Sequence, residues 1–347
     1  MSLGVGIIGA GPGVSALHLP TLARMDGVFD VVHVSDGGSG RAQESAARVG
    51  ARWSTGVEGL LADDRVAVVA ICSPPAHHAE QILAAVAAGK RAILCEKPLA
   101  TTIADAEEVI DACRAAGTAL LVGTNHLYDP AWMRAKHHLL VGGHRVRAMA
   151  LTLALPPNGR YHDVVTELRD AAAPAPSRTA PDLRVPQVAA SVVRQLITGL
   201  AVHDLPMLRD LAPVIDEVVF ARAISPIGYT LGYCASGIPI RMTTVMLPDG
   251  ADAVWRLDIT TDTDRLAVAF PPAFVHVGSA EVSVRSASGT TTTYPTTPDD
   301  GYVAEWRALA DVLDGTTVIE YDELLDDARY TIALADAAAE FIVEAAR

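Results

Sequence analysis

Short apolar runs alternate with longer amphipathic stretches over the first third of the chain. The predicted strands are residues 4–9, 29–35, 66–73, 91–95 and 119–123. The predicted helices between them are residues 14–25, 41–50, 76–90 and 103–117. Strands that are apolar on both faces, each followed by a helix, are typical of a parallel sheet covered by helices on both sides. The pattern predicts a doubly wound α/β domain over residues 1–125.

The pattern changes from about residue 144, where apolar and polar positions begin to alternate. Strands are predicted at residues 145–155, 216–225, 240–248, 253–262, 265–271 and 280–287, and helices at 190–212, 302–314 and 322–346. Turn signals such as PDG and ASG separate some of these strands, which predicts a mostly antiparallel sheet. We expect a second, α/β domain over residues 126–347, whose final helix packs back on the first domain or stays with the second.

A Pro- and Ala-rich loop is predicted at residues 171–186. A loop of that length inside a compact domain is either mobile or functional, for example as a lid or an oligomer arm.

Composition narrows the class of protein. The chain has 347 residues, half of them hydrophobic, and a formal net charge of −14. That length favours two domains, and the negative charge argues against a nucleic-acid partner and against an anionic membrane surface. The chain enters a strand pattern at once, without a basic leader, and no apolar run reaches the length of a membrane span, so we expect a cytoplasmic protein. The four cysteines form no C-x-x-C pair or metal-like spacing, and no metal site is predicted.

The stretch GAGPGV follows the first predicted strand and opens the first predicted helix. Gly9 permits a tight turn, and Gly11 lets the backbone approach a pyrophosphate at the helix N-terminus. The candidate cofactor-binding residues of this turn are Gly9, Gly11, Pro12, Gly13 and Val14. Val14 stands where the G-x-G-x-x-G motif has Gly or Ala, so the helix is expected slightly further from the strand.

An acidic residue ends the second predicted strand. The Asp36 carboxylate suits the two hydroxyls of an adenine ribose and repels a 2′-phosphate, which favours NAD over NADP. Arg41 lies close enough to leave NADP open. In the alternative interpretation, Asp36 belongs to a polar turn and caps the next helix.

Two further stretches follow predicted strands. Ser73 ends the predicted strand 66–73 and Pro74 follows it, at a carboxyl strand end where open sheets bind ligands. His78 is a candidate ligand contact or, alternatively, a surface residue. Glu96 and Lys97 follow residues 91–95 in the same way. A partly desolvated lysine has a lowered pKa and can hydrogen-bond a substrate hydroxyl, and Glu96 modulates that pKa. Pro98 is a candidate for a cis peptide bond with Lys97.

These motifs occur in one order along the chain: Gly9, Gly11, His18 and Pro20; Asp36; Ser73 to His78; the A-G-K-x-x-L-C-E-K-P element from Ala88 to Pro98; and Gly123 to Asn125. The first domain thereby resembles the Gfo/Idh/MocA family of NAD(P)-dependent oxidoreductases. The resemblance implies a Rossmann domain followed by an α/β domain with an open antiparallel sheet. It also implies oxidation or reduction of sugars, cyclitols and related polyols. Lys97 would contact substrate and assist proton transfer, Asn125 would lie near the nicotinamide, and subunits would form homodimers or homotetramers.

The second domain departs from the family pattern. The family commonly shows D-x-G-x-H with the histidine as acid/base, and here the stretch is GLAVH. His203 fills the histidine position, but Gly199 stands where the aspartate is expected. His203 is therefore either the acid/base, with altered substrate positioning, or a helix-start residue capped by Asp204. Where the family often has Asn-x-Arg, this chain offers His126 and Tyr128.

Three functions follow from these residues. The first is NAD(P)-dependent hydride transfer at a carbinol or ketone of a polyol-like substrate, with Lys97 and His203 as catalytic residues. The second is NAD-dependent glycoside cleavage with no net redox change. The third is a catalytically silent nicotinamide sensor that regulates a protein partner, which the loss of the aspartate at Gly199 keeps open.

Overall fold

The computed structural model describes residues 2–156, 180–247, 252–272 and 275–347. The chain divides into two compact units. The first contains residues 1–125 and 302–329, and the second contains residues 126–301 and 330–347. The stretch 302–329 thus returns to the first unit after the chain has built the second. Most of the predicted loop at 171–186, and the PDG turn at 248–250, lie outside the described residues.

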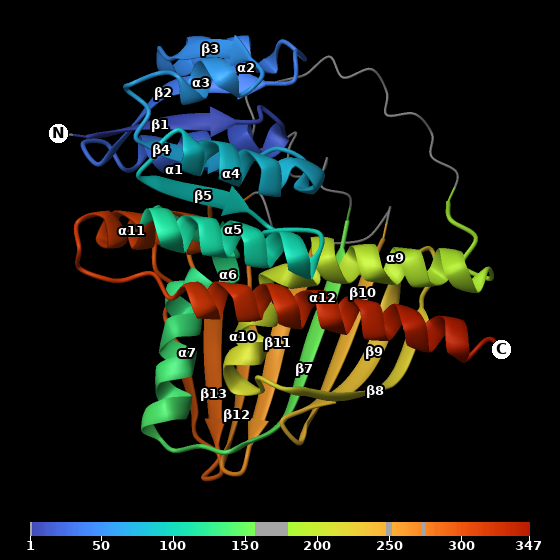
Figure 1. Cartoon of the computed structure of the whole chain (residues 1–347). Coiled ribbons are helices and arrows are strands. Elements are labelled where there is room, and N and C mark those ends of the chain that lie inside the picture. The colour runs from blue at the N-terminus through green and yellow to red at the C-terminus, as the bar shows by residue number, and fades with distance from the viewer. Residues whose placement is uncertain (1, 157–179, 248–251, 273–274) are drawn as a thin grey trace. The chain divides into compact units, whose positions relative to one another are not determined.

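The first unit is built on a six-stranded sheet whose neighbouring strands are all parallel. Its strand order is β3-β2-β1-β4-β5-β6, so the direction in which strands are added reverses between β1 and β4 (Figure 1). The strands are β1 (Leu3–Ile8), β2 (Phe29–Asp36), β3 (Arg52–Thr55), β4 (Val68–Ile71), β5 (Ala92–Glu96) and β6 (Ala119–Gly123). Because β4 and β6 are buried at every position, they read as continuous apolar runs in the sequence.

The helices of this unit follow from local sequence signals. The helices are η1 (Val14–His18), α1 (Leu19–Ala23), α2 (Arg41–Val49), α3 (Glu58–Leu61), η2 (Pro75–His77), α4 (His78–Ala87) and α5 (Ile103–Ala116). Thr102 caps α5 by accepting a hydrogen bond from the Asp105 amide, at 3.1 Å. Gly50 ends α2 with a φ of 70°, a conformation that glycine adopts without strain. The predicted helix at 14–25 starts as a π-helical turn.

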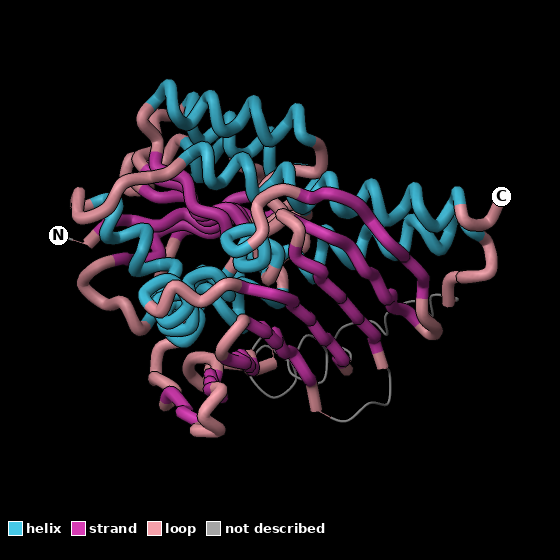
Figure 2. The backbone as a smooth tube through the Cα atoms, turned by 90° about the horizontal axis from the view of Figure 1, so that it is seen from below, coloured by secondary structure: helices cyan, strands magenta, loops and turns pink. Residues whose placement is uncertain are grey.

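The second unit carries an eight-stranded sheet in the order β14-β13-β12-β11-β7-β10-β9-β8. Figure 2 shows these strands side by side in one sheet. Only the β7–β10 pair is parallel among the described neighbours, which confirms the predicted mostly antiparallel sheet. The strands are β7 (Val146–Leu155), β8 (Ile215–Ala223), β9 (Ile227–Ala235), β10 (Ile238–Met246), β11 (Val254–Thr261), β12 (Asp264–Ala269), β13 (Glu281–Ser286) and β14 (Thr291–Tyr294).

Helices cover one face of this larger sheet (Figure 1). They are α7 (Pro130–Val141), α9 (Pro186–Gly199) and α10 (Leu205–Leu211), with the short α6 (Asn125–Tyr128) and η3 (Ala201–His203) before α7 and α10. The chain ends with α11 (Gly301–Leu313) and α12 (Tyr321–Glu344). Trp132 of α7 packs into a core with Tyr229 and Tyr233 of β9, and all three are almost fully buried. Every second residue of β7 from Met149 onward enters that core, as the alternating sequence predicted.

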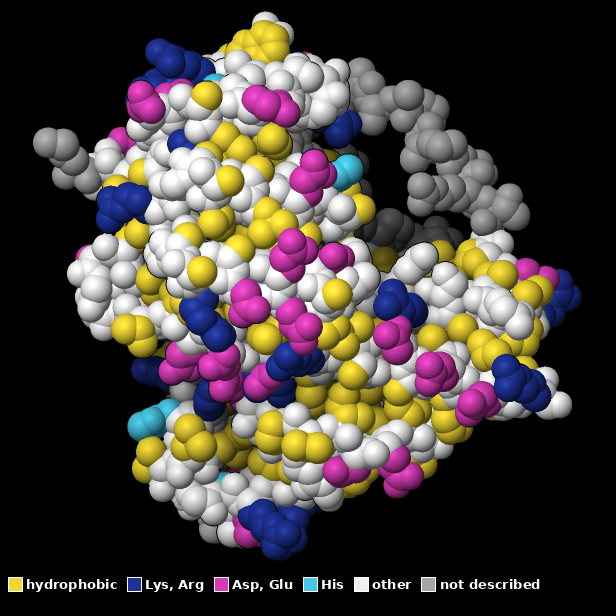
Figure 3. Space-filling view, viewed as in Figure 1, with side chains coloured by type: hydrophobic (Ala, Val, Ile, Leu, Met, Phe, Trp, Pro, Cys, Tyr) yellow, Lys and Arg dark blue, Asp and Glu magenta, His cyan; other side chains and the backbone are white. Residues whose placement is uncertain are grey.

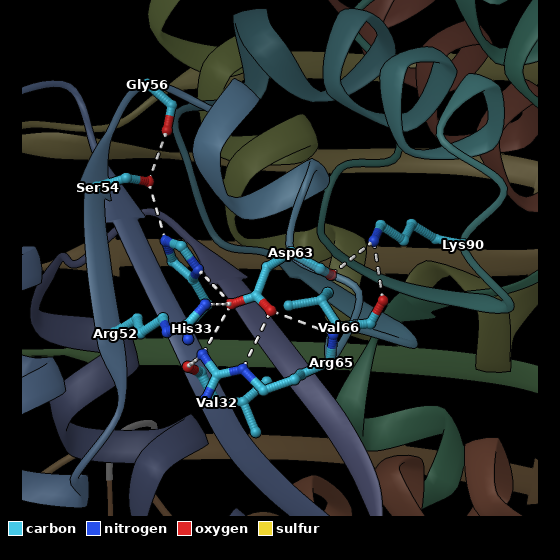
Figure 4. A network of polar contacts seen from close by, with 9 residues as sticks. All are labelled: Val32, His33, Arg52, Ser54, Gly56, Asp63, Arg65, Val66 and Lys90. Atoms are coloured by element: carbon cyan, nitrogen blue, oxygen red, sulfur yellow. Dashed lines mark hydrogen bonds and ion pairs between the residues drawn. The ribbon is translucent and has the colours of Figure 1, made fainter.

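A buried carboxylate organises the first unit before β4, at the amino-end edge of the parallel sheet (Figure 4). Asp63 accepts hydrogen bonds from Arg65, with Nη2 at 2.8 Å, and contacts His33 Nδ1 at 3.0 Å. Lys90 reaches the same loop, and its Nζ donates to the Val66 carbonyl at 2.9 Å. The hydrogen bonds from Arg65 hold the pKa of Asp63 well below its usual range; burial opposes this effect, and His33 adds to it.

We expect Asp63→Asn to destabilise the protein by about 2 kcal/mol at neutral pH, because the buried His33 and the more exposed Arg65 lose a charged, buried acceptor. A carboxyl whose folded pKa is depressed contributes stability above its unfolded pKa of about 3.9, and that contribution is lost as the pH falls further. Urea unfolding at pH 7 and near pH 3.5 measures both effects. Asp64→Asn removes an exposed neighbouring charge and is the matched control. Equal unfolding free energies for Asp63→Asn and wild type at pH 7 would contradict the assignment.

Acidic and basic side chains are interspersed over the face on which α5 and α12 lie (Figure 3). Within the first unit, Arg114 pairs with Asp322, and Arg329 pairs with Glu107 at 2.7 Å. On this face, therefore, the net negative charge is not gathered into one acidic patch. Among the helices of the described ranges, none combines the length and the apolar character needed to cross a membrane.

Candidate active site

Four predicted motifs lie at one edge of the parallel sheet of the first unit. Gly9 follows β1, Ser73 follows β4, Lys97 follows β5, and Asn125 lies just after β6. These four strands are parallel neighbours in the order β1-β4-β5-β6, so their carboxyl ends share one edge. The reversal between β1 and β4 lies at this edge, where open α/β sheets bind ligands.

A cavity of about 650 Å³ opens at this edge of the sheet within the first unit. Its lining includes six of the predicted cofactor-binding residues, which are Gly9, Gly11, Asp36, Arg41, Ser73 and Pro74. The other predicted residues, Pro12, Gly13, Val14, His78, Glu96, Lys97 and Asn125, lie outside the lining that the structure defines. Ser35, His77 and Gln81 also line the cavity and were not singled out from the sequence.

The turn after β1 depends on glycine. Gly9 has a φ of +100°, and a Cβ placed there would lie 2.6 Å from the Cys72 carbonyl oxygen. Neither a side chain's backbone preference nor the available space allows another residue at this position. At Gly11 and Gly13, a Cβ would meet no described atom within 4 Å. The backbone beside the cavity is thus bare of side chains, and a pyrophosphate could approach it.

Asp36 forms the polar turn of its alternative interpretation and also lines the cavity, and its contact with a ribose stays a prediction. It lines the cavity, and its carboxylate also accepts hydrogen bonds from the Gly38 amide at 2.8 Å, the Ala42 amide at 3.1 Å, and the Ser39 hydroxyl. Burial raises the pKa of Asp36, but these hydrogen bonds outweigh it and leave the pKa below its usual value. An ionised acceptor is therefore held at the cavity wall, at the start of α2.

His78 lies inside the first unit, and its contact with a ligand stays a prediction. Its side chain is fully buried, so the surface alternative is wrong. Nδ1 contacts the Pro98 carbonyl at 2.8 Å, and Nε2 contacts the Ser73 carbonyl at 2.9 Å. His78 thereby joins the loop after β4 to the turn after β5, and its neighbour His77 lines the cavity.

The turn after β5 holds Lys97 between a carboxylate and a proline. Burial lowers the pKa of Lys97, and the nearby Glu96 charge opposes that shift. Lys97–Pro98 is a cis peptide bond, as the sequence suggested. Lys97 is thus a half-buried amine that loses its proton more readily than a surface lysine.

Glu96 is fixed by His18, the histidine of the first-helix motif. His18 Nε2 lies 2.9 Å from Glu96 Oε1, and the Trp306 indole N–H donates to His18 Nδ1 at 3.3 Å. Because Nδ1 accepts from Trp306, Nε2 carries the proton and donates to Glu96. Burial raises the pKa of Glu96, but the His18 bond and the Lys97 charge bring it below its usual value. Trp306 lies on α11, and no sequence signal pointed to this contact.

Asn125 and Ser35 carry polar atoms that match an absent partner. Among the described residues, Asn125 Oδ1 and Ser35 Oγ are buried without a hydrogen-bond partner. Buried polar atoms are normally paired, so Ser35 Oγ in the cavity wall, and Asn125 Oδ1 just after β6 but outside that lining, are available to a bound group. Together with the bare glycine turn and the ionised Asp36, these atoms fit a dinucleotide with a ribose and an amide donor.

A polar cluster lies inside the core of the second unit. The Asp204 carboxylate is fully buried and accepts hydrogen bonds from the Trp255 indole N–H, at 2.8 and 3.0 Å. His126 Nδ1 lies 2.9 Å from Asp204 Oδ1, and the His126 ring stacks on Phe270 with centroids 3.9 Å apart. Burial raises the pKa of Asp204 above its usual value, and the hydrogen bonds from His126 and Trp255 offset only part of this effect.

His203 is the third ring of this polar cluster. Its centroid lies 5.5 Å from that of His126 and 5.7 Å from that of Trp255, and the residue is buried. The Asp204 side chain is directed to His126 and Trp255, so the interpretation in which it caps α10 is wrong. The sequence analysis assigned no role to His126. Its pairing with Asp204 could not be predicted, because the two positions are 78 residues apart.

The strand order, the glycine turn and the acidic end of β2 define the first unit as a dinucleotide-binding Rossmann domain. Residues 3–124 match the model of the oxidoreductase family with an NAD-binding Rossmann fold, GFO_IDH_MocA. In this region the chain is similar to the Gfo/Idh/MocA family, as the motifs predicted.

Relatives with assigned activities match different lengths of the chain. Inositol 2-dehydrogenase 2 from Saccharopolyspora erythraea is 34% identical over 228 residues, which are 65% of this chain and 58% of that protein. The chain thus spans little more than half the length of this relative. The 1,5-anhydro-D-fructose reductase of Ensifer adhaerens is 42% identical over 109 residues, 30% of this chain and 32% of that protein.

A solved structure matches the fold over nearly the whole chain. It is KijD10, a 3-ketoreductase from Actinomadura kijaniata, in complex with NADP and TDP-benzene. The TM-score is 0.73 at 20% sequence identity, and the match covers 96% of this chain and 97% of the other. At this identity the likeness supports the fold class and no more.

Proposed function

We propose that this chain is an NAD(P)-dependent oxidoreductase that transfers a hydride between nicotinamide and a carbinol or ketone of a sugar, cyclitol or related polyol. The observation that carries the proposal is the half-buried Lys97, with its lowered pKa, at the sheet edge that also forms the cavity. The named activities of the inositol and anhydrofructose relatives agree with this substrate class.

The cofactor would be held in the first unit by the backbone at Gly9 and Gly11, by Asp36 at the ribose, and by Asn125 near the amide. When bound, NAD(P) accepts or supplies the hydride. Lys97 hydrogen-bonds the substrate hydroxyl and takes up its proton in the oxidation direction, or returns it in the reduction direction. Burial favours the neutral amine that this step needs.

In the second unit, His126 is the alternative acceptor of this proton. The Asp204 carboxylate accepts from Nδ1–H, so Nε2 is the basic nitrogen of the neutral ring. An imidazole oriented by a carboxylate is the arrangement that a general base requires. Asp204 is then a positioning residue. It supplies a carboxylate to the site, whereas the position where the family has an aspartate is Gly199 in this chain. The acid/base role predicted for His203 stays a prediction, and separate His126→Ala and His203→Ala variants distinguish the two.

Titration with NADH and with NADPH tests the cofactor site. We expect tighter binding of NADH, because Asp36 repels a 2′-phosphate. Asp36→Ser should weaken NADH binding about tenfold. The variant should also show a smaller preference for NADH over NADPH than the wild type. Calorimetry measures both constants, and a thermal melt checks that the start of α2 stays folded. Glu44→Gln removes an exposed charge from the first turn of α2 and is the control.

Other outcomes of this titration are informative. A preference for NADPH in the wild type would assign the phosphate contact to Arg41 instead. Binding of neither cofactor would remove the basis of the oxidoreductase proposal.

A substrate screen separates the three functions predicted from the sequence. Net NADH formation with inositols, sugars or related polyols supports the dehydrogenase. Release of sugar from a glycoside without net NADH formation indicates the glycoside-cleaving alternative. Cofactor binding with no turnover of any substrate indicates the sensor. Cytoplasmic location and assembly into homodimers or homotetramers stay predictions, and light scattering of the purified chain checks the assembly.

A further inference from the structure

A second cluster of potential ligands lies in the second unit, apart from the His126 cluster. His138 is near the end of α7, His144 lies in the connection from α7 to β7, and Asp264 is the first residue of β12. One ligand atom from each of the three lies within 4.8 Å of the others. No other such group of three is found among the described residues. No sequence pattern marked this cluster, because the carboxylate is more than a hundred positions from the histidines.

The imidazole nitrogens converge on one carboxylate oxygen. His138 Nε2 lies 2.9 Å from Asp264 Oδ2, and His144 Nε2 lies 3.4 Å from the same atom. The two rings are stacked, with centroids 4.8 Å apart and an interplanar angle of 11°. The exposed fractions of the side chains are 25% for His138, 17% for His144 and 8% for Asp264. The cluster is thus partly buried yet reachable from solvent.

Neighbouring groups hold the His144 ring and the Asp264 backbone in place. His144 Nδ1 lies 2.7 Å from Thr263 Oγ1, which leaves Nε2 directed at Asp264. The Asp264 amide donates to Thr261 Oγ1 at 2.8 Å. Hydrogen bonds that orient the ligands from behind are typical of metal sites.

Gly142 makes room for the His144 ring. A Cβ at residue 142 would lie 2.0 Å from His144 Nε2. The ring can therefore take this position only because residue 142 has no side chain.

We propose that His138, His144 and Asp264 form a binding site for a divalent transition-metal ion of the zinc type. Two imidazoles and one carboxylate suit Zn²⁺, and a solvent molecule completes four-coordination. With bonds of about 2.0–2.1 Å, ligand atoms on a tetrahedral ion lie roughly 3.3 Å apart. The His144–Asp264 separation already matches this spacing, and the His138–Asp264 contact needs to open by a few tenths of an ångström. The ligand nitrogens of His138 and His144 lie within 4.8 Å of each other and need to take up the same spacing on the ion. The ion would tie α7 and its following turn to the β11–β12 hairpin.

The test is zinc binding to the tag-free full chain after treatment with a chelator. We expect one equivalent of Zn²⁺ by calorimetry, and a melting temperature that rises by roughly 5 °C at a hundredfold excess over the dissociation constant. His144→Ala should weaken binding at least a hundredfold. Gly142→Ala should also weaken it, because its methyl group displaces the His144 ring without removing a ligand.

His137→Ala is the matched control, since His137 is the exposed neighbour of His138 and lies outside the group of three. It should bind zinc as the wild type does. No zinc binding to the wild type, or equal binding to wild type and His144→Ala, would overturn the proposal. In that case the three residues form a hydrogen-bonded cluster only. The test does not involve the cofactor or turnover, so its outcome is independent of the proposed oxidoreductase activity.

Discussion

Lys97→Ala is expected to lower kcat/KM by about 10²- to 10⁴-fold, because the substrate hydroxyl loses its proton acceptor. NADH binding should change little, since Lys97 lies outside the lining of the cavity. In the oxidation direction, the wild-type rate should rise with pH as Lys97 loses its proton. The midpoint should lie below that of an ordinary lysine, because burial lowers its pKa. Steady-state rates across pH and a calorimetric NADH titration measure these effects.

Two variants sharpen this experiment. Lys97→Arg should not restore activity, because a guanidinium keeps its proton at every working pH. Lys136→Ala is the control, since Lys136 is a partly buried lysine that pairs with Asp210 in the second unit. Full activity in Lys97→Ala, with the same pH profile as the wild type, would remove Lys97 from the mechanism.

Asp204→Asn is expected to lower kcat about a hundredfold or more with a smaller change in KM. An asparagine can still accept from Trp255, but its NH₂ group faces His126 Nδ1 and favours the tautomer with the proton on Nε2. The basic nitrogen would then be lost while the ring stays in place. Rates across pH for both kinetic constants, with a thermal melt for folding, measure the effect.

A double variant separates positioning from packing. If Asp204 acts through His126, Asp204→Asn should cost little activity once His126 is already alanine. Additive losses would show that Asp204 supports the core and not the imidazole. His203→Ala tests the alternative base. A complete loss of activity in His203→Ala, together with full activity in His126→Ala, would show that His203 and not His126 transfers the proton.

The sequence alone determined the first unit nearly completely. Most of its strands are buried on both faces, so apolar runs mark them, and glycine and acidic residues mark the strand ends that we propose to bind the cofactor. The short exposed strands β3 and β14 were not predicted. β3 has no buried residue and β14 is mostly exposed, so neither shows a pattern of apolar positions in the sequence. β9 was missed although it is largely buried: its glycines and threonine break the alternation.

Only the tertiary structure decided which distant side chains meet. Trp306 reaches His18 because residues 302–329 return to the first unit. Asp204 reads as a helix cap in the sequence, but in the fold its carboxylate meets His126 and Trp255, since β11 passes beside it. His138, His144 and Asp264 come together through the packing of α7 against β12. Local patterns record burial and turns, whereas these pairings depend on how elements pack, which no short stretch of sequence specifies.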